Sequence, residues 1–87
     1  MSTKEHIEIV KTPDVLGGKP RIDGVRVGVL QVGDLVRELD EDIETVMSEL
    51  RLSRGQVEAA LDYYDAHPDE MDAERARDEW ARQQVQE

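Results

Sequence analysis

Basic and amide side chains at two places in the chain have the chemistry that contacts with nucleic acid require. Arginine binds phosphate or guanine, and glutamine binds adenine, through paired hydrogen bonds. In a helix-turn-helix, the N-terminal end of the second motif helix meets base edges in the major groove. The tip of one expected helix and a basic group upstream of it supply such side chains. The candidate DNA-binding residues are Arg51, Ser53, Arg54, Gln56, Lys19, Arg21 and Arg26.

Part of this set has a second interpretation that involves no ligand. Ser53 followed three residues later by Gln56 forms a capping box, in which each side chain binds the other residue's backbone N–H. Further along the same predicted helix, Glu58, Asp62 and Asp65 would repel phosphates if they faced DNA. A helix with this charge pattern would touch DNA only with its first turn.

Partner binding is the competing hypothesis, and it rests on the C-terminal segment. Trp80 is the single tryptophan and lies where the sequence offers little else to bury it. Tryptophan and arginine are frequent anchors at protein interfaces. We therefore regard Met71, Arg77 and Trp80 as candidate partner-binding residues. The alternative is that Trp80 folds back over the core.

The residues give little basis for catalysis. Cysteine is absent, and the two histidines, His6 and His67, lie far apart in the sequence. The segment Gly17-Gly18-Lys19-Pro20 resembles part of a phosphate loop, but it lacks the upstream glycine and the following Ser or Thr. We expect no enzyme activity, no catalytic residues, no metal site and no cofactor.

The charge of the chain is strongly acidic. Asp and Glu number 21 against 11 Lys and Arg, giving a net charge of −10. Arginines outnumber lysines and phenylalanine is absent, a composition typical of adaptation to high salt. Such a surface repels nucleic acid at long range, so any DNA contact would depend on a local basic patch.

Hydropathy predicts a chain that does not enter a membrane. No apolar run approaches the roughly 18 residues of a spanning helix. Residues 1–8 lack the apolar core of a signal peptide, so we expect a cytoplasmic protein.

The N-terminal third predicts short strands. Ile7 and Ile9 alternate with polar neighbours, as in a strand. Asp23-Gly24 is followed by alternating valines, and Asp-Gly is a strong hairpin signal because both turn positions need positive φ. We predict a β-hairpin over about residues 20–29.

Three segments then show the apolar spacing i, i+3, i+4, i+7 of an amphipathic helix. The three stripes are Val32/Leu35/Val36/Leu39, Ile43/Val46/Met47/Leu50 and Val57/Ala60/Leu61/Tyr64. Asp40 or Asp42 can cap the second helix, and the connection to Ser53 is tight, with Leu52 turned into the core. A tight turn before a capped helix fits a helix-turn-helix, although any three-helix cluster with short loops has the same periodicities.

The last 20 residues predict a helix of a different kind. His67-Pro68 ends the third helix, and residues 69–86 are helix-prone but poorly amphipathic, with Ala73, Ala76 and Trp80 aligned. We therefore predict an α+β fold, mostly α, with a domain at residues 1–67. Residues 68–87 would form an acidic helical tail that is exposed, frayed or ordered by a partner.

Two groups of residues resemble a known family. Residues 17–27, with the sequence GGKPRIDGVRV, and later Leu52-Ser53, Val57, Ala59-Ala60-Leu61 and Tyr63-Tyr64 look like the domain of unknown function 433 family. These are VapB-like antitoxins described as winged or plain helix-turn-helix proteins. The resemblance covers about residues 6–71. The chain departs from the family at Val25, where a small polar residue is usual, and at residues 39–42, where a glycine break is common.

The resemblance implies an antitoxin of a type II toxin-antitoxin system. Its helical core would bind operator DNA, and its C-terminal tail would sequester a PIN-like ribonuclease toxin. A homodimer is expected, because one small module makes few phosphate contacts. The alternative is a dimeric protein-interaction module without DNA binding.

Overall fold

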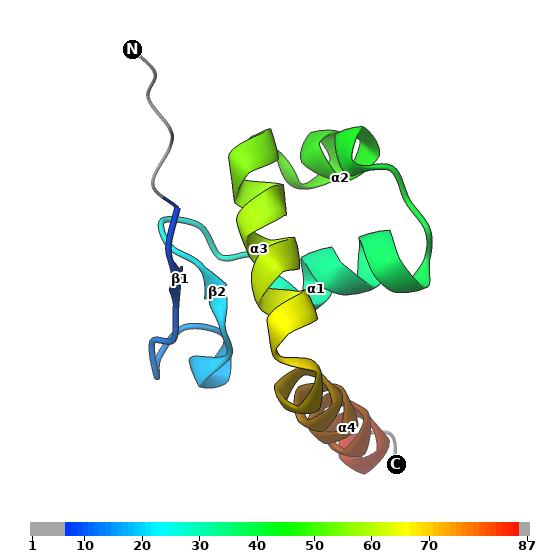
Figure 1. Ribbon diagram of the computed structural model, residues 1–87. Helices are drawn as coiled ribbons and strands as arrows, with labels where there is room; N and C mark the ends of the chain where they lie inside the picture. The colour runs from blue at the N-terminus through cyan, green and yellow to red at the C-terminus, as the bar shows by residue number, and fades with distance from the viewer. Residues whose placement is uncertain (1–6, 86–87) are drawn as a thin grey trace.

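The computed structural model describes residues 7–85, with the side chain of residue 85 excepted. A small antiparallel strand pair precedes four helices, so the predicted class, α+β and mostly α, is confirmed (Figure 1). The 3-10 turn η1 lies between the strands, and η2 is a π-helical turn that continues α1. In chain order the elements are β1 (Ile9–Val10), η1 (Leu16–Gly18), β2 (Arg21–Ile22), α1 (Val29–Gly33), η2 (Asp34–Glu38), α2 (Ile43–Leu50), α3 (Arg54–Ala66) and α4 (Pro68–Val85).

The strands pair differently from the local hairpin that the Asp-Gly turn predicts. β1 pairs with β2, with Ile9 opposite Ile22. The predicted hairpin at residues 20–29 is reduced to a turn closed by one bridge, between Arg21 and Gly28. The returning arm cannot pair further because α1 begins directly after Gly28. β1 pairs with the other edge of β2, so Arg21 lies between Val10 on one side and Gly28 on the other.

Helix α3 is the centre of the molecule. It contacts α1, α2, α4 and both strands, and Figure 1 shows the strands on one side of it and α1 and α2 on the other. Each of the three predicted stripes supplies core residues, and Leu52 is buried as expected. The buried apolar residues are Ile22, Val29, Leu30, Val32, Val46, Leu52, Val57, Ala60, Leu61 and Met71.

Helices α1 and α3 pack closely against each other at Gly33. A Cβ at Gly33 would lie 1.8 Å from Cδ2 of Tyr64, so the tyrosine ring lies directly against the α1 backbone. The Tyr64 hydroxyl continues past Gly33 and donates a hydrogen bond to Oδ1 of Asp34 at 3.0 Å. Glycine at this position is therefore required by packing rather than by backbone conformation.

The connection between α2 and α3 has the tight geometry that the sequence predicts. Arg51 ends α2 in the left-handed conformation, with φ of 59°, and the Leu52 N–H donates to the Met47 carbonyl at 3.0 Å. Ser53 Oγ accepts from the Gln56 N–H at 3.1 Å, and Gln56 Oε1 accepts from the Ser53 N–H at 2.9 Å. The predicted capping box is confirmed. It fixes the first turn of α3.

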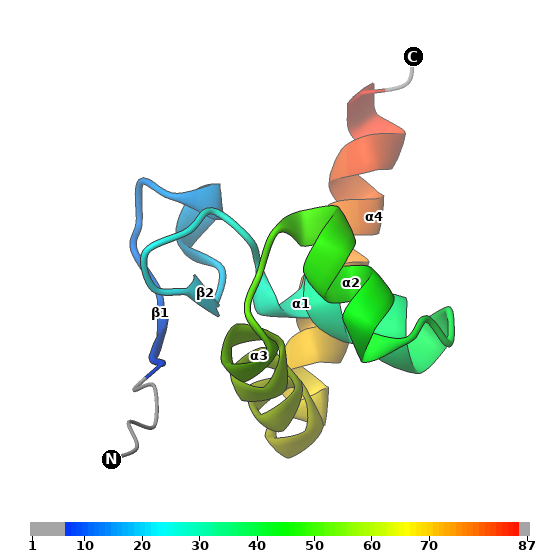
Figure 2. The ribbon, with the colours of Figure 1, turned by 90° about the horizontal axis from the view of Figure 1, so that it is seen from above.

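Helix α4 packs on the core for only part of its length. Met71 and Glu74 are 1% and 2% exposed, so the core extends beyond residue 67. Two ion pairs tie this part to the N-terminal region: Lys11 to Glu70 at 2.8 Å, and Lys19 to Asp78 at 2.5 Å. From residue 79 to residue 84 every side chain is exposed, and Figure 2 shows this end of α4 leading away from the other helices.

Candidate functional site

The two sides of α4 differ in exposure. Side chains 100° apart on successive residues place Ala73, Ala76 and Trp80 on one side, which we call the outer stripe. All three are exposed, and Trp80 is 64% exposed. Met71 and Glu74 lie on the opposite side and face the core. The alternative expectation, that Trp80 folds back over the core, is wrong.

Met71 corrects one of the partner-binding predictions. Its side chain is 1% exposed and belongs to the core cluster, so it is not available to a partner. Sequence reasoning missed this role because the neighbours of Met71 on the inner side of α4 are charged, which conceals the helical apolar pattern. Arg77 and Trp80 remain at the surface.

The candidate DNA-binding residues at the tip of α3 are already engaged within the chain. Ser53 and Gln56 form the capping box. Arg54 lies 3.2 Å from a carboxylate oxygen of Glu44 and 3.7 Å from one of Glu58. Both carboxylates reduce the positive charge that Arg54 could offer to a phosphate.

The remainder of the exposed side of α3 is acidic. Glu58, Asp62 and Asp65 all face solvent. Arg37 donates two hydrogen bonds to Asp65, at 3.1 Å from Nε and 2.6 Å from Nη2, and these bonds lower the pKa of the Asp65 carboxyl. The carboxylate therefore stays charged. Glu58 and Asp65 are paired with Arg54 and Arg37, so Asp62 carries most of the net negative charge that this side of α3 would present to DNA.

Two of the three upstream cations have structural contacts. Lys19 pairs with Asp78 of α4. Arg21 donates to the Val25 carbonyl at 2.9 Å and thereby closes the turn that follows β2. Arg26 and Arg51 are exposed, and neither makes an ion pair within residues 7–85. Of the seven candidate DNA-binding residues, Arg26 and Arg51 are thus the exposed cations without an ion pair within residues 7–85. They lie on different loops.

A polar network that the sequence did not suggest joins α4 to η2 and α3. Arg75 Nη2 lies 2.7 Å from Oδ1 of Asp34 and 3.0 Å from the hydroxyl of Tyr64. Arg75 Nη1 also binds Asp72 at 3.0 Å. These contacts raise the pKa of the Arg75 guanidinium, chiefly through the hydrogen bond to Asp34. The residues come from three elements, so no local pattern could have predicted their meeting.

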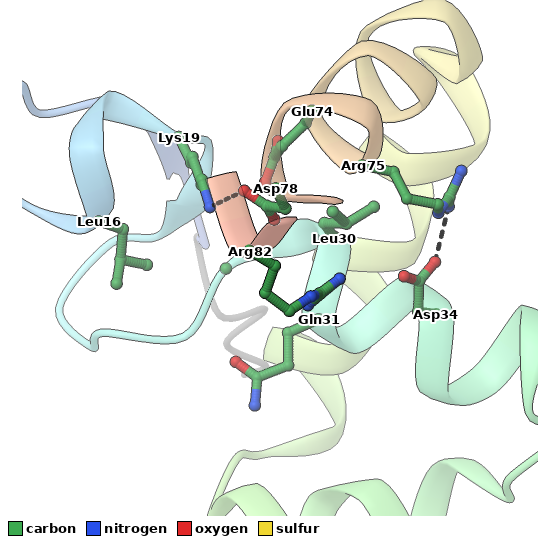
Figure 3. A pocket seen from close by; sticks show the side chains of 10 residues that line it. Leu16, Lys19, Leu30, Gln31, Asp34, Glu74, Arg75, Asp78 and Arg82 are labelled. Atoms are coloured by element: carbon green, nitrogen blue, oxygen red, sulfur yellow. Dashed lines mark hydrogen bonds and ion pairs between the residues drawn. The ribbon is translucent and has the colours of Figure 1, made fainter. Parts of the chain in front are cut away.

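A pocket of about 410 Å³ lies between η1, α1 and α4 (Figure 3). Glu74 and Asp78 project into it from α4, and Lys19 reaches Asp78 from the other wall. Glu74 Oε1 is enclosed and has no hydrogen-bond donor. Burial raises the pKa of the Glu74 carboxyl.

The described residues contain neither a metal-binding cluster nor a helix that could span a membrane. No group of three His, Cys, Asp or Glu side chains within residues 7–84 is arranged to hold a metal ion. His67 stacks on Tyr63, with 3.9 Å between the ring centroids, and His6 lies outside the described residues. None of the helices within residues 7–85 combines the length and the apolar character needed to cross a bilayer.

A family model matches residues 9–64, and its description is DUF433, a protein of unknown function. The chain therefore belongs to the DUF433 family. The match includes both strands, α1 and α2 and most of α3, and it ends at Tyr64, before α4. No curated protein and no solved structure matches the chain.

Proposed function

We propose that this chain is an antitoxin-like protein that binds a partner protein through the outer stripe of α4. One observation carries the proposal: Trp80 is 64% exposed on a helix that has already left the core. The partner implied by the family resemblance is a PIN-like ribonuclease. Sequestration of such a partner by α4 would block its access to RNA.

The form of α4 supports this role. A helix that lays an apolar side into a groove is a recurring mode of recognition, and tryptophan is a frequent energetic anchor there. The inner side of α4 is fixed to the core by Met71 and by the Arg75–Asp34 contact. The outer stripe thus lies on a helix that is already formed, which lowers the conformational entropy lost on binding.

Recognition of operator DNA by α3 has weaker support. The capping box uses Ser53 and Gln56, and Glu44 and Glu58 lie beside Arg54. We therefore favour the alternative in which the chain binds proteins rather than DNA. Homodimer formation stays a prediction that sedimentation equilibrium can check.

A ribonuclease inhibition assay tests the proposal. The full chain is purified together with a PIN-like nuclease encoded by a neighbouring gene, if the genome carries one, and cleavage of a labelled RNA is followed against inhibitor concentration. Trp80→Ala should weaken inhibition about 30-fold, the effect of losing an anchor worth about 2 kcal/mol. Leu39→Ala is the matched control, because Leu39 is equally exposed at 64% and lies outside α4.

Two outcomes would overturn this proposal. The first is that Trp80→Ala and Leu39→Ala inhibit equally well, since the outer stripe would then have no role. The second is that the neighbouring gene encodes no such nuclease.

A separate titration tests DNA binding. Fluorescence anisotropy with the promoter DNA should give the same weak, salt-dependent affinity for the wild type and for the double variant Arg51→Glu/Arg54→Glu. A loss of more than about tenfold in the double variant, absent with unrelated DNA, would restore α3 as a recognition helix.

A further inference from the structure

The pocket between η1, α1 and α4 is lined by three cationic and three carboxylate side chains. Lys19 pairs with Asp78 at 2.5 Å and Arg75 with Asp34 at 2.7 Å, whereas the third cation, Arg82, makes no ion pair within residues 7–85. Glu74, on the same side of α4 as Asp78 and one turn before it, has no such partner. Figure 3 shows the Glu74 side chain beside Asp78, facing the pocket.

Glu74 is the most enclosed charged residue that the structure describes. It is 2% exposed, and its Oε1 has no donor within hydrogen-bond distance. A buried charged oxygen without a donor is costly, and native structures normally satisfy such atoms with protein, water or ligand. The carboxylate therefore marks a place where a donor is missing.

We propose that this pocket binds a primary alkylammonium group, with the Glu74 carboxylate as its ion-pair partner. The pocket already holds one group of this kind, the Lys19 ammonium on the neighbouring Asp78. Leu16 and Leu30 line the same space and can cover an alkyl stem. A volume of about 410 Å³ lies in the range of small-molecule sites.

The chemistry of Glu74 favours an ammonium over other ligands. An ionised carboxylate only accepts hydrogen bonds, and an ammonium offers three donors in a compact group. A metal ion would need further ligands, and no metal-binding group of three acidic or histidine side chains forms within residues 7–84. The proposal is independent of the outer stripe, because Glu74 lies on the opposite side of α4 from Trp80.

The ammonium could belong to a free amine or to a lysine side chain of another protein. The chemistry at Glu74 is the same in both cases, so the probes must separate them. n-Butylammonium represents the free amine. Nα-acetyl-lysine methylamide represents a lysine within a chain.

Amide NMR shifts of the full-length protein provide the test. n-Butylammonium should produce saturable shifts at Gly28, Leu30 and Glu74, and n-butanol, a neutral molecule of similar shape, should not. Glu74→Gln should weaken binding about tenfold or more, because a charge-assisted contact is lost. Glu79→Gln is the matched control, since Glu79 is an exposed acid on the same helix.

A second measurement uses the wild-type protein, so it does not depend on whether a variant folds. The side-chain carboxyl ¹³C shift of Glu74 in the wild type reports its protonation, and bound ammonium should lower the pKa of this carboxyl. Saturation by both probes would assign the site to lysine side chains as well as free amines, and saturation by n-butylammonium alone would assign it to free amines. Linear, unsaturated shifts with both probes, or equal shifts in Glu74→Gln, would overturn the proposal.

Discussion

Helices α3 and α4 form opposite kinds of contact with the same core. α3 has 13 residues and is in contact with α1, α2, α4 and both strands, mainly through the apolar residues Val57, Ala60 and Leu61. α4 is longer, at 18 residues, but only its first part is in contact with the core, through Met71 and a set of ion pairs. The length of a helix therefore does not indicate how many of its residues pack on the core.

The largest expected effect tests the close packing of α3 on α1. Gly33→Ala should destabilise the protein by about 3 kcal/mol or more, because the new Cβ would lie 1.8 Å from the Tyr64 ring. Alanine normally stabilises a helix relative to glycine, so the sign itself is diagnostic. Urea unfolding measures the free energy. Gly28→Ala is the control, since its Cβ would meet nothing closer than 3.6 Å.

A pair of substitutions should divide α4 into two parts. Met71→Ala should cost about 2–3 kcal/mol, the usual loss for a buried methionine. Trp80→Ala should change the free energy of unfolding by less than about 0.5 kcal/mol, since its side chain is exposed. Thermal melts of both variants provide the measurement. An equal decrease in the free energy of unfolding in both variants would mean that Trp80 also packs on the core.

The buried acid of α4 predicts a dependence of stability on pH. Because burial raises the pKa of Glu74 above its ordinary value of 4.5, the folded state binds this proton more tightly than the unfolded state does. The stability contribution of Glu74 is therefore lost as the pH rises above about 4.5.

Glu74→Gln should consequently be more stable than the wild type at pH 7, by an amount on the order of 1 kcal/mol. The advantage should disappear near pH 4. Urea unfolding at both pH values gives the measurement, and Glu79→Gln, an exposed acid, should show no such crossover. An advantage that stays constant with pH would contradict this account.

The smallest expected effect concerns the end of α2. Arg51 adopts φ of 59°, a conformation that costs a non-glycine residue about 1 kcal/mol. Arg51→Gly should therefore raise the free energy of unfolding by about 0.5–1 kcal/mol, measured by thermal melting. Arg26→Gly, at another exposed arginine for which no such φ is recorded, should give no gain.

The sequence predicted the parts of the fold that depend on local or periodic signals. The apolar stripes apart from Leu39, which is exposed, the capping box at Ser53 and the burial of Leu52 required only spacing and residue type. The pairing of β1 with β2 was not predictable in this way, because a loop separates Ile9 from Ile22 and no local or periodic signal links them.

The candidate site was predicted less completely than the fold. Exposure of Trp80 agreed with the thin stripe around it. The burial of Met71 and Glu74 was missed, because a helix that docks through ion pairs shows no apolar periodicity. The ion pair between Arg54 and Glu44 was missed as well, since these residues belong to different helices.

A single residue, His67, separates α3 from α4, so the position of Trp80 depends on how α4 packs. Met71, Glu74 and Asp78 hold the first part of α4 on the core, so the helix leaves the core only after residue 78. Trp80 follows Pro68 by 12 residues, which corresponds to about 18 Å along the helix axis. A protein bound at Trp80 would therefore lie at a set distance from the start of α4.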